Sequence, residues 1–301
     1  MRPSFSKNSM GSKTLGIVAA LGSAASWAMG AILFKKLGEQ LSSPGMALVK
    51  SFLSAALLGA VLLAVGYQNI GAGALVCLIA SGALGIAIGD TFFFAALKEL
   101  SPHFLIVLLT SGQVLTVVLA VCFLGETPTL KTWIGIVLVI GGISVVLRAN
   151  LSGEKRESQL RGAALGMLSV VCMSVSVIIA KRGLAGVSAM EATFVRMLAA
   201  ALTMLLLSAF RWQAVEWLLP FRNRRLLGRF FGSVCMVTFG GFWLSLLAVK
   251  HLEVSVANTL NSAEPLFVLP LAACFLKERV TAAALSGSLI AVSGISFLCL
   301  S

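Results

Sequence analysis

The sequence predicts an all-α polytopic membrane protein with ten transmembrane helices, arranged as two inverted repeats of five helices. Three observations lead to this fold class. Hydrophobic residues make up 58% of the 301 residues and charged residues only 11%, whereas a soluble globular protein is about 25% charged. The apolar residues form ten long runs, and the second half of the chain repeats the first.

Charged and turn residues divide the chain into runs of about the 20 mostly apolar residues that one membrane helix requires. The breaks carry markers such as Lys35-Lys36 and Glu126-Thr127-Pro128, and they are too short to hold a soluble domain. The predicted spans are 14–36, 44–66, 73–97, 102–124, 130–148, 160–182, 188–210, 226–250, 255–276 and 281–300.

An internal duplication relates the two halves, at an offset of 152 residues in their C-terminal parts and 146 in their N-terminal parts. Each half holds five spans, and because five is odd the second half enters the membrane from the opposite side. Inverted repeats of this kind are typical of secondary transporters, whose substrate site lies at the repeat interface. Matched pairs are Gly16 and Gly162, Ser23 and Ser169, Lys35 and Lys181, Lys50 and Arg196, Gly89 and Gly241, Cys122 and Cys274, Glu126 and Glu278, Gly135 and Gly287, and Gly142 and Gly294.

The duplication also sets the expected domains. We expect a first five-helix repeat over residues 1–148, a charged linker over 149–159 and a second repeat over 160–301. The two offsets differ because of extra residues between spans seven and eight, where Arg211–Arg225 is rich in tryptophan and arginine. We expect this connector to lie at the membrane interface. The glycines of spans five and ten provide small faces for close helix packing, within one protomer or between two.

Several paired motifs resemble the EamA-type ten-helix transporters of the drug/metabolite transporter superfamily, over the whole chain. The resemblance implies an exporter or exchanger of small metabolites, with a central cavity lined by helices one, three, four, six, eight and nine. The motifs are the basic pairs that end the first span of each half (Lys35-Lys36 and Lys181-Arg182), the basic residue of each second span (Lys50 and Arg196), the Leu-x-Glu after each fourth span (Leu124-Gly125-Glu126 and Leu276-Lys277-Glu278), and Asn261-Ser262-Ala263-Glu264-Pro265-Leu266.

Asp90 and Glu264 are the acidic candidates for function inside the spans. Ionisable side chains at membrane depth are costly and usually functional. Because a buried carboxyl group is stable only when it is protonated or paired, both residues are candidates for proton coupling. The alternative for Asp90 is an ion pair with Lys50 or Lys98, and the alternative for Glu264 is a structural hydrogen bond between helices.

Polar and aromatic residues at mid-span are the candidates for lining a substrate cavity. In span nine, Asn258, Asn261 and Ser262 share one helical face, and Lys50 and Arg196 are candidates for a gate or for charge pairing. Trp27 and Trp243 lie at mid-span rather than in an interfacial belt, and their alternative role is plain packing. The predicted cavity residues are Ser23, Trp27, Asp90, Thr110, Gln113, Ser169, Met173, Trp243, Asn258, Asn261, Ser262 and Glu264.

These features predict a secondary active transporter, an exporter or exchanger, which moves a small metabolite, amino acid or drug-like solute across the plasma or inner membrane by alternating access. The alternatives are a channel or non-transporting scaffold, and an integral-membrane lipid enzyme. The chain has no GxxxxGK[ST] motif and no Cys/His cluster, so we expect no ATP hydrolysis, no enzyme activity, no metal and no cofactor. The expected partners are the solute and the bilayer, the expected state is a monomer or homodimer, and we expect no nucleic acid.

The net charge of +12 concerns orientation in the membrane, because the basic residues other than Lys50 and Arg196 lie in the N-terminus or in the short breaks between spans. The odd-numbered breaks hold fourteen of them, whereas the N-terminus and the even-numbered breaks hold seven. The positive-inside rule would therefore place both termini outside. The family resemblance implies instead that both termini are cytoplasmic, and both orientations stay open.

Overall fold

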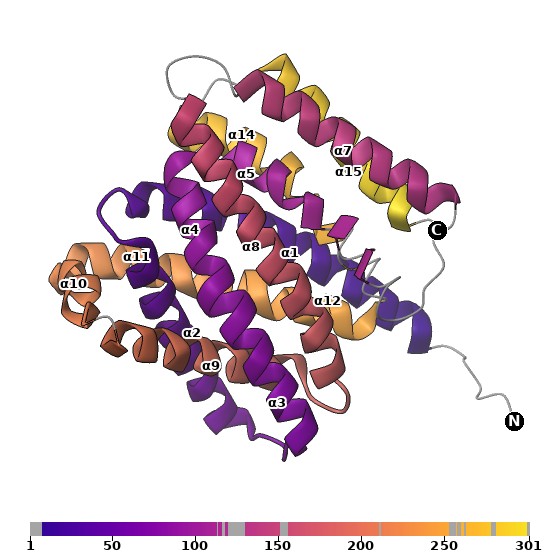
Figure 1. Ribbon diagram of the computed structural model, residues 1–301. Helices are drawn as coiled ribbons and strands as arrows, with labels where there is room; N and C mark the ends of the chain where they lie inside the picture. The colour runs from indigo at the N-terminus through magenta and orange to yellow at the C-terminus, as the bar shows by residue number, and fades with distance from the viewer. Residues whose placement is uncertain are drawn as a thin grey trace, which may run out of the picture.

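The computed structural model describes residues 8–112, 114–115, 118–119, 130–150, 156–210, 212–252, 257, 260–261, 263–277 and 281–299. Within these ranges the fold is a helical bundle without a strand (Figure 1). The all-α prediction is confirmed. The predictions for Gln113, Asn258 and Ser262 concern residues outside the described ones.

Among the described residues, six helices are long and apolar enough to cross a membrane, and they coincide with six predicted spans. Shorter apolar helices at Trp133–Gly142, Glu264–Leu276 and Ala282–Gly294 lie within three more. The protein is therefore a multi-pass membrane protein, while the count of ten helices stays a prediction. The six are Lys13–Gly38, Ser43–Val65, Ala72–Glu99, Glu157–Gly183, Ala189–Phe210 and Arg224–His251.

Four of the long spans are single α-helices: α1 (Asn8–Gly38), α2 (Ser43–Val65), α8 (Arg156–Gly183) and α9 (Ala189–Phe210). Their limits follow local chemistry. At the start of α2 the Ser42 hydroxyl accepts a 3.2 Å hydrogen bond from the Gly45 amide, which satisfies an otherwise unpaired helix donor. Gly66 ends α2 with a φ of 88°, a conformation that glycine adopts readily.

The third and eighth spans are each interrupted by a π-helical segment. The third consists of α3 (Ala72–Ser81), η1 (Gly82–Gly89) and α4 (Asp90–Glu99). The eighth consists of α11 (Arg224–Met236), η3 (Val237–Trp243) and α12 (Leu244–His251). Further helices are α5 (Pro102–Leu109), α7 (Leu130–Asn150), α14 (Glu264–Leu276) and α15 (Ala282–Cys299).

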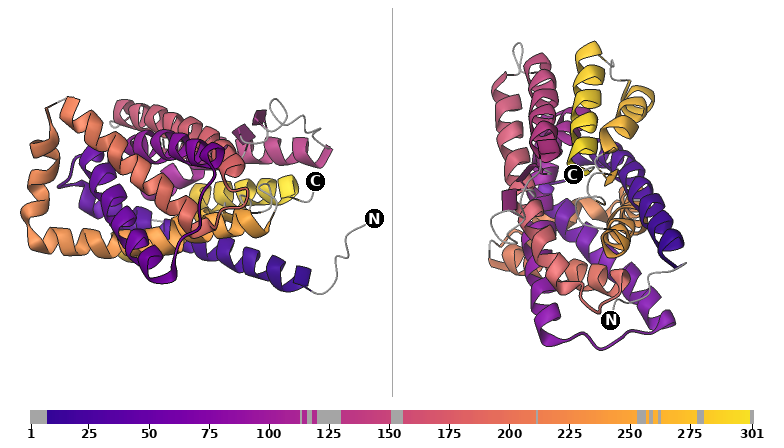
Figure 2. Two further views of the ribbon diagram at one scale, coloured as in Figure 1. Left: turned by 90° about the horizontal axis from the view of Figure 1, so that it is seen from below. Right: turned by 90° about the vertical axis from the view of Figure 1, so that its right-hand side faces the viewer.

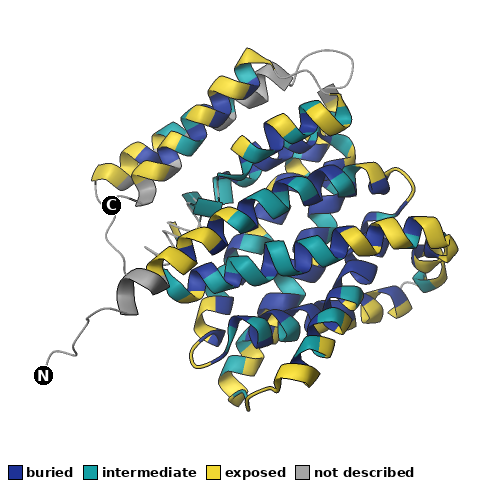
Figure 3. Cartoon of the chain, turned by 180° about the vertical axis from the view of Figure 1, so that it is seen from behind, coloured by how far each residue is buried: buried dark blue, intermediate teal, exposed yellow. Residues whose placement is uncertain are grey.

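The surface of the bundle is apolar. Figure 3 shows exposed residues along the outward faces of the helices and buried residues along their inner faces. Large hydrophobic side chains such as Val18, Leu63 and Leu206 are 63%, 85% and 71% exposed. Such extensive exposure would be unfavourable in water but suits contact with lipid.

The turns of the chain collect at two ends of the bundle. At one end the Gly45 backbone packs on Trp217, and the Ser158 hydroxyl donates to the Glu99 carboxylate. The connector helix α10 (Ala214–Leu218) and the short η2 (Leu219–Arg222) lie across this end, between α9 and α11 (Figure 2, left). We call it the α10 end. At the other, the α8–α9 end, the Gln68 amide donates to Glu191 at 2.5 Å.

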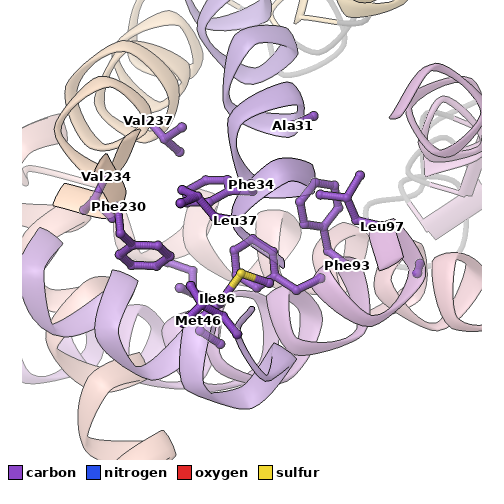
Figure 4. Packing of buried hydrophobic residues seen from close by; sticks show 14 of the residues in the cluster. Ala31, Phe34, Leu37, Met46, Ile86, Phe93, Leu97, Phe230, Val234 and Val237 are labelled. Atoms are coloured by element: carbon purple, nitrogen blue, oxygen red, sulfur yellow. The ribbon is translucent and has the colours of Figure 1, made fainter. Parts of the chain in front are cut away.

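A cluster of five buried or nearly buried aromatic side chains fills the α10 end, and Figure 4 shows part of it. The Phe34 ring lies 5.1 Å from the Phe94 ring and 5.6 Å from the Phe230 ring, centroid to centroid. Phe93 lies 5.4 Å from Phe94, and Phe221 lies 5.0 Å from Phe230. We call these five residues the aromatic cluster, which joins α1 and α4 to η2 and α11.

Helices α7 and α15 pack side by side as a pair at the edge of the bundle (Figures 1 and 2). Gly142 of α7 touches the backbone of Gly287 and Ala291 on α15, so that a side chain at Gly142 would collide with them. The small faces predicted for spans five and ten therefore meet within one protomer, as close packing of membrane helices requires.

Candidate functional site

A cavity of about 230 Å³ lies inside the bundle and reaches toward the α8–α9 end. Phe93 of the aromatic cluster contributes to its wall on the α10 side, and Ala180, Leu184 and Val249 contribute on the other side. The lining residues are Trp27, Gly85, Ile86, Asp90, Phe93, Ile106, Leu109, Thr110, Gly112, Val170, Met173, Ser174, Ser176, Val177, Ala180, Leu184, Arg196, Phe242, Ser245, Leu246, Val249, Asn261, Glu264 and Pro265. They come from spans one, three, four, six, eight and nine, with Arg196 added from span seven.

Glycines of η1 allow two helices to approach the cavity closely. Gly82 touches the backbone of Arg196 on α9, and Gly85 touches the Ser176 side chain on α8. A Cβ atom at either glycine would collide with these atoms. The η1 segment thus provides the space in which α8 and α9 carry Ser176 and Arg196 to the cavity wall. Short π-helical segments of this kind are frequent at functional sites.

Lys50 and Asp90 form a buried ion pair at the edge of the cavity, with side chains 2% and 3% exposed. Lys50 was one of the two lysines predicted as a partner for Asp90. The Lys50 Nζ also lies 4.4 Å from the centroid of the Phe242 ring, a cation–π geometry. The Lys50 charge is therefore balanced by a carboxylate and by the face of an aromatic ring.

Arg196 is the second buried cation at this site, and it lines the cavity itself. Its Nη2 donates a 3.1 Å hydrogen bond to the Ser176 hydroxyl, which in turn donates to the Ser81 carbonyl at 2.8 Å. Its Nε is buried without a hydrogen-bond acceptor. Among the described residues, the one ion pair within 4.0 Å joins Lys50 and Asp90, and Arg196 is not part of it.

Glu264 and Asn261 bring polar groups into the cavity from the ninth span. The Asn261 Nδ2 donates to the Ser245 hydroxyl at 3.1 Å, whereas its Oδ1 is buried without a partner. Glu264 is the first residue of α14, followed directly by Pro265. Glu264 lines the cavity, and no described residue forms an ion pair with its carboxyl group.

Six of the predicted cavity residues lie together on the cavity wall: Trp27, Asp90, Thr110, Met173, Asn261 and Glu264. The Thr110 hydroxyl donates to the Val107 carbonyl at 2.6 Å, within its own helix. Trp27 contacts Phe242 edge-on, with ring centroids 4.6 Å apart. Packing and cavity lining, the two roles considered for Trp27, are therefore combined in this residue.

Ser23, Ser169 and Trp243 are not among the residues that line this cavity. The Ser23 hydroxyl donates to the Gly241 carbonyl and the Ser169 hydroxyl to the Gly89 carbonyl, both at 2.9 Å. The two serines are fully buried between helices. Trp243 packs edge-on against Phe239, with ring centroids 6.5 Å apart, which is the packing role considered as its alternative.

Ser176 and Phe242 line the cavity although the sequence did not single them out for it. Ser176 follows Ser169 and Met173 on one face of α8, where helical periodicity places residues i, i+4 and i+7. Phe242 occupies the place of Asp90 in the second repeat. Helical periodicity could have identified Ser176, and correspondence between the repeats could have identified Phe242. In the described part of the chain, no group of three His, Cys, Asp or Glu residues could hold a metal ion.

The chain was compared with solved structures, curated proteins and protein families. A crystal structure of a protein that is 18% identical has a TM-score of 0.61 to this chain, and the match covers 96% of this chain and 98% of that one. That similarity shows a shared fold alone. No match was found among curated proteins. The EamA-like transporter family matches residues 14–148 and 160–300, which is both halves of the chain. The chain therefore belongs to the EamA-like transporter family.

Proposed function

We propose that the protein is a secondary active transporter, which exports or exchanges a small metabolite, amino acid or drug-like solute across the cell membrane by alternating access. The proposal includes ten membrane helices in two inverted repeats, over residues 1–148 and 160–301. The observation that carries it is the central cavity, which is walled by both halves of the chain and contains Asp90, Arg196 and Glu264. Charged groups at membrane depth mark solute and ion pathways.

Corresponding contacts in the two halves support alternating access. The Lys35 Nζ donates to the carbonyls of Leu97, Lys98 and Leu100 at 2.6, 2.9 and 2.9 Å. Its repeat partner Lys181 donates to the carbonyl of Val249, the counterpart of Leu97, at 3.3 Å. Equivalent lysines thus bind equivalent helix ends, but the hydrogen bonds of Lys35 are shorter and more numerous than that of Lys181. Inverted repeats that exchange two such arrangements would expose one cavity to each side in turn.

Glu264 and Asp90 are the proposed coupling residues. Glu264 faces the cavity without an ion pair among the described residues, so a proton there can be exchanged with the solute or with water. Asp90 is paired with Lys50, so its protonation would release that lysine and alter the contact between α2 and α4. The position of Glu264 therefore favours direct proton transfer, and the pairing of Asp90 favours a change of conformation.

The test is solute flux in proteoliposomes that contain the purified full-length protein. Radiolabelled amino acids, carboxylates and quaternary ammonium compounds are assayed with and without an imposed pH gradient. We expect saturable uptake of at least one class. Glu264→Gln should abolish accumulation driven by the gradient while exchange without a gradient persists, and Asp90→Asn should slow both. The matched control is Glu216→Gln, an exposed residue on α10.

Several outcomes would count against parts of this proposal. Flux that does not saturate would support a channel instead of a transporter. Unchanged gradient-driven accumulation in both Glu264→Gln and Asp90→Asn would remove proton coupling through these residues. A wild-type protein that moves no solute under any gradient would contradict the transport function itself.

A further inference from the structure

We propose that Arg196 is an anion-binding subsite of the cavity and that the transported solute carries a carboxylate or phosphate group, which this guanidinium binds. The proposal deepens the transport function proposed above, and its meaning for the substrate rests on that function. The anion site itself can be tested by binding alone.

The first argument is the surroundings of the Arg196 side chain. The residue is only 6% exposed, lines the cavity, and has one hydrogen bond from Nη2 to the Ser176 hydroxyl. Its buried Nε has no acceptor. A guanidinium carries five N–H donors in a rigid plane, and a buried charge is costly unless it is paired and hydrogen-bonded. The donors that the protein leaves unused are therefore available to an acceptor in the cavity.

The second argument comes from the repeat. Lys50 is the counterpart of Arg196, and it is balanced by the Asp90 carboxylate and the Phe242 ring. In the second half, the place of Asp90 is taken by Phe242. The buried cation of the first half is therefore directly paired with a carboxylate, whereas the buried cation of the second half has no described carboxylate within 4.0 Å, although Asp90 lines the same cavity. A ligand in the cavity can provide the missing anion.

The third argument is preorganisation. Ser81 and Ser176 exchange hydrogen bonds, from the Ser81 hydroxyl to the Ser176 carbonyl at 2.8 Å and from the Ser176 hydroxyl to the Ser81 carbonyl at 2.8 Å. This pair fixes the hydroxyl that holds Arg196, and Gly82 fixes the α9 backbone at Arg196. A guanidinium held in this way can bind a carboxylate or phosphate with two parallel hydrogen bonds.

Glu264 limits which anions fit. It lines the same cavity and forms no ion pair with Arg196, so the space between the guanidinium and this carboxyl group is left to the solute. A solute with an anionic group for Arg196 and a neutral or positive remainder beside Glu264 satisfies both. A solute with a second anionic group would place that group near the Glu264 carboxyl group and is disfavoured.

The experiment measures binding to the purified full-length protein in detergent through its thermal unfolding. The probes are propionate, benzoate and inorganic phosphate, with propionamide and benzamide as uncharged analogues of the two carboxylates. The variants are Arg196→Gln, which removes the charge, and Arg196→Lys, which keeps the charge but not the planar fork. Arg222→Gln, an exposed arginine in η2, is the control.

We expect at least one anion to raise the melting temperature with a saturable concentration dependence, whereas its amide does not. Loss of a charge-assisted hydrogen bond should raise the apparent Kd of that anion about tenfold or more in Arg196→Gln. Arg196→Lys should bind more weakly than wild type and still prefer the acid over the amide, which separates a binding role from a folding defect. Arg222→Gln should match wild type.

Equal stabilisation by acid and amide, undiminished anion binding in Arg196→Gln, or no response of the wild type to any of the three anions would overturn the anion site. Flux of the same labelled anions in proteoliposomes keeps the two proposals apart. Arg196-dependent binding without flux contradicts transport and leaves the anion site intact. Saturable flux in Arg196→Gln with a wild-type KM contradicts the anion site and leaves transport intact.

Discussion

The Ser23 hydroxyl donates a 2.9 Å hydrogen bond to the Gly241 carbonyl, and the same bond at the same length joins their repeat partners Ser169 and Gly89. Each bond connects the first helix of one half to the π-helical segment of the other half. The duplication visible in the sequence is therefore matched by an atomic contact that is made twice, across the boundary between the halves.

Replacing either serine by alanine should destabilise the protein by a similar amount. The lost hydroxyl leaves a buried carbonyl without its donor, and side-chain hydrogen bonds in membrane proteins are worth about 0.6 kcal/mol on average. We therefore expect a loss of about 0.5–1.5 kcal/mol for Ser23→Ala and for Ser169→Ala. Thermal unfolding in detergent measures this. Ser286→Ala, at an exposed position of α15, is the control, and a loss confined to one repeat partner would contradict the equivalence.

Gly82→Ala should disturb the site from a distance. The new methyl group would collide with the backbone of Arg196, and overpacking of this kind costs about 1–3 kcal/mol. Gly232→Ala in α11 meets no atom within 4 Å, and alanine is the better helix former by about 1 kcal/mol. Unfolding measurements should therefore give opposite signs for the two variants. Equal effects would show that the close approach of α3, η1 and α9 is not needed.

The Lys50–Asp90 pair should behave as one unit. Removal of one partner leaves an unpaired buried charge, which costs about 3–5 kcal/mol. We expect Lys50→Met and Asp90→Leu each to be strongly destabilised, and the double variant to be more stable than the sum of the single losses implies. Lys36→Met, at an exposed residue of α1, serves as the control. Additive losses in the double-mutant cycle would show that the two charges act independently.

Ala180→Phe should block the cavity without unfolding the protein. Ala180 lines the cavity on α8 and is the repeat counterpart of Phe34. A phenyl ring here would occupy the space toward the α8–α9 end, so saturable flux in proteoliposomes should fall at least about tenfold. Val171→Phe places the same ring on the exposed face of α8 and should leave flux unchanged. Full flux in Ala180→Phe would place the solute path elsewhere.

The helical fold was predictable because a helix that crosses a lipid bilayer must be mostly apolar and about 20 residues long. Continuous apolar runs with charged breaks gave the positions of α1, α2, α8 and α9 to within a few residues at most ends. The π-helical segments were not predictable, because a π turn depends on the neighbours it accommodates, such as Ser26 and Trp27 against Gly240 and Gly241. Helical periodicity does not record such contacts.

The site was predictable in type more than in detail. Charge at membrane depth directed attention to Asp90, Arg196 and Glu264, and the structure places these three residues on the wall of one cavity. Helical periodicity placed Ser23 and Trp27 on the same face. Trp27 lines the cavity, whereas the Ser23 hydroxyl donates to the Gly241 carbonyl. A helical face specifies a direction, and which neighbouring helix meets that face depends on the packing of the whole bundle. The same reason left both Lys50 and Lys98 open as the partner of Asp90.

The aromatic cluster distinguishes the two ends of the molecule. Phe34, Phe93 and Phe94 correspond to Ala180, Ser245 and Leu246 in the second half, and all three of these counterparts line the cavity. Burial of one phenylalanine contributes about 2 kcal/mol, and the opposite closure has no equivalent rings to bury. We therefore expect the empty protein to rest in the conformation that is shut at the α10 end. In the proposed transport cycle, a bound solute must then supply the free energy that populates the reverse state. The return step would be tied to occupancy, which favours exchange over leakage.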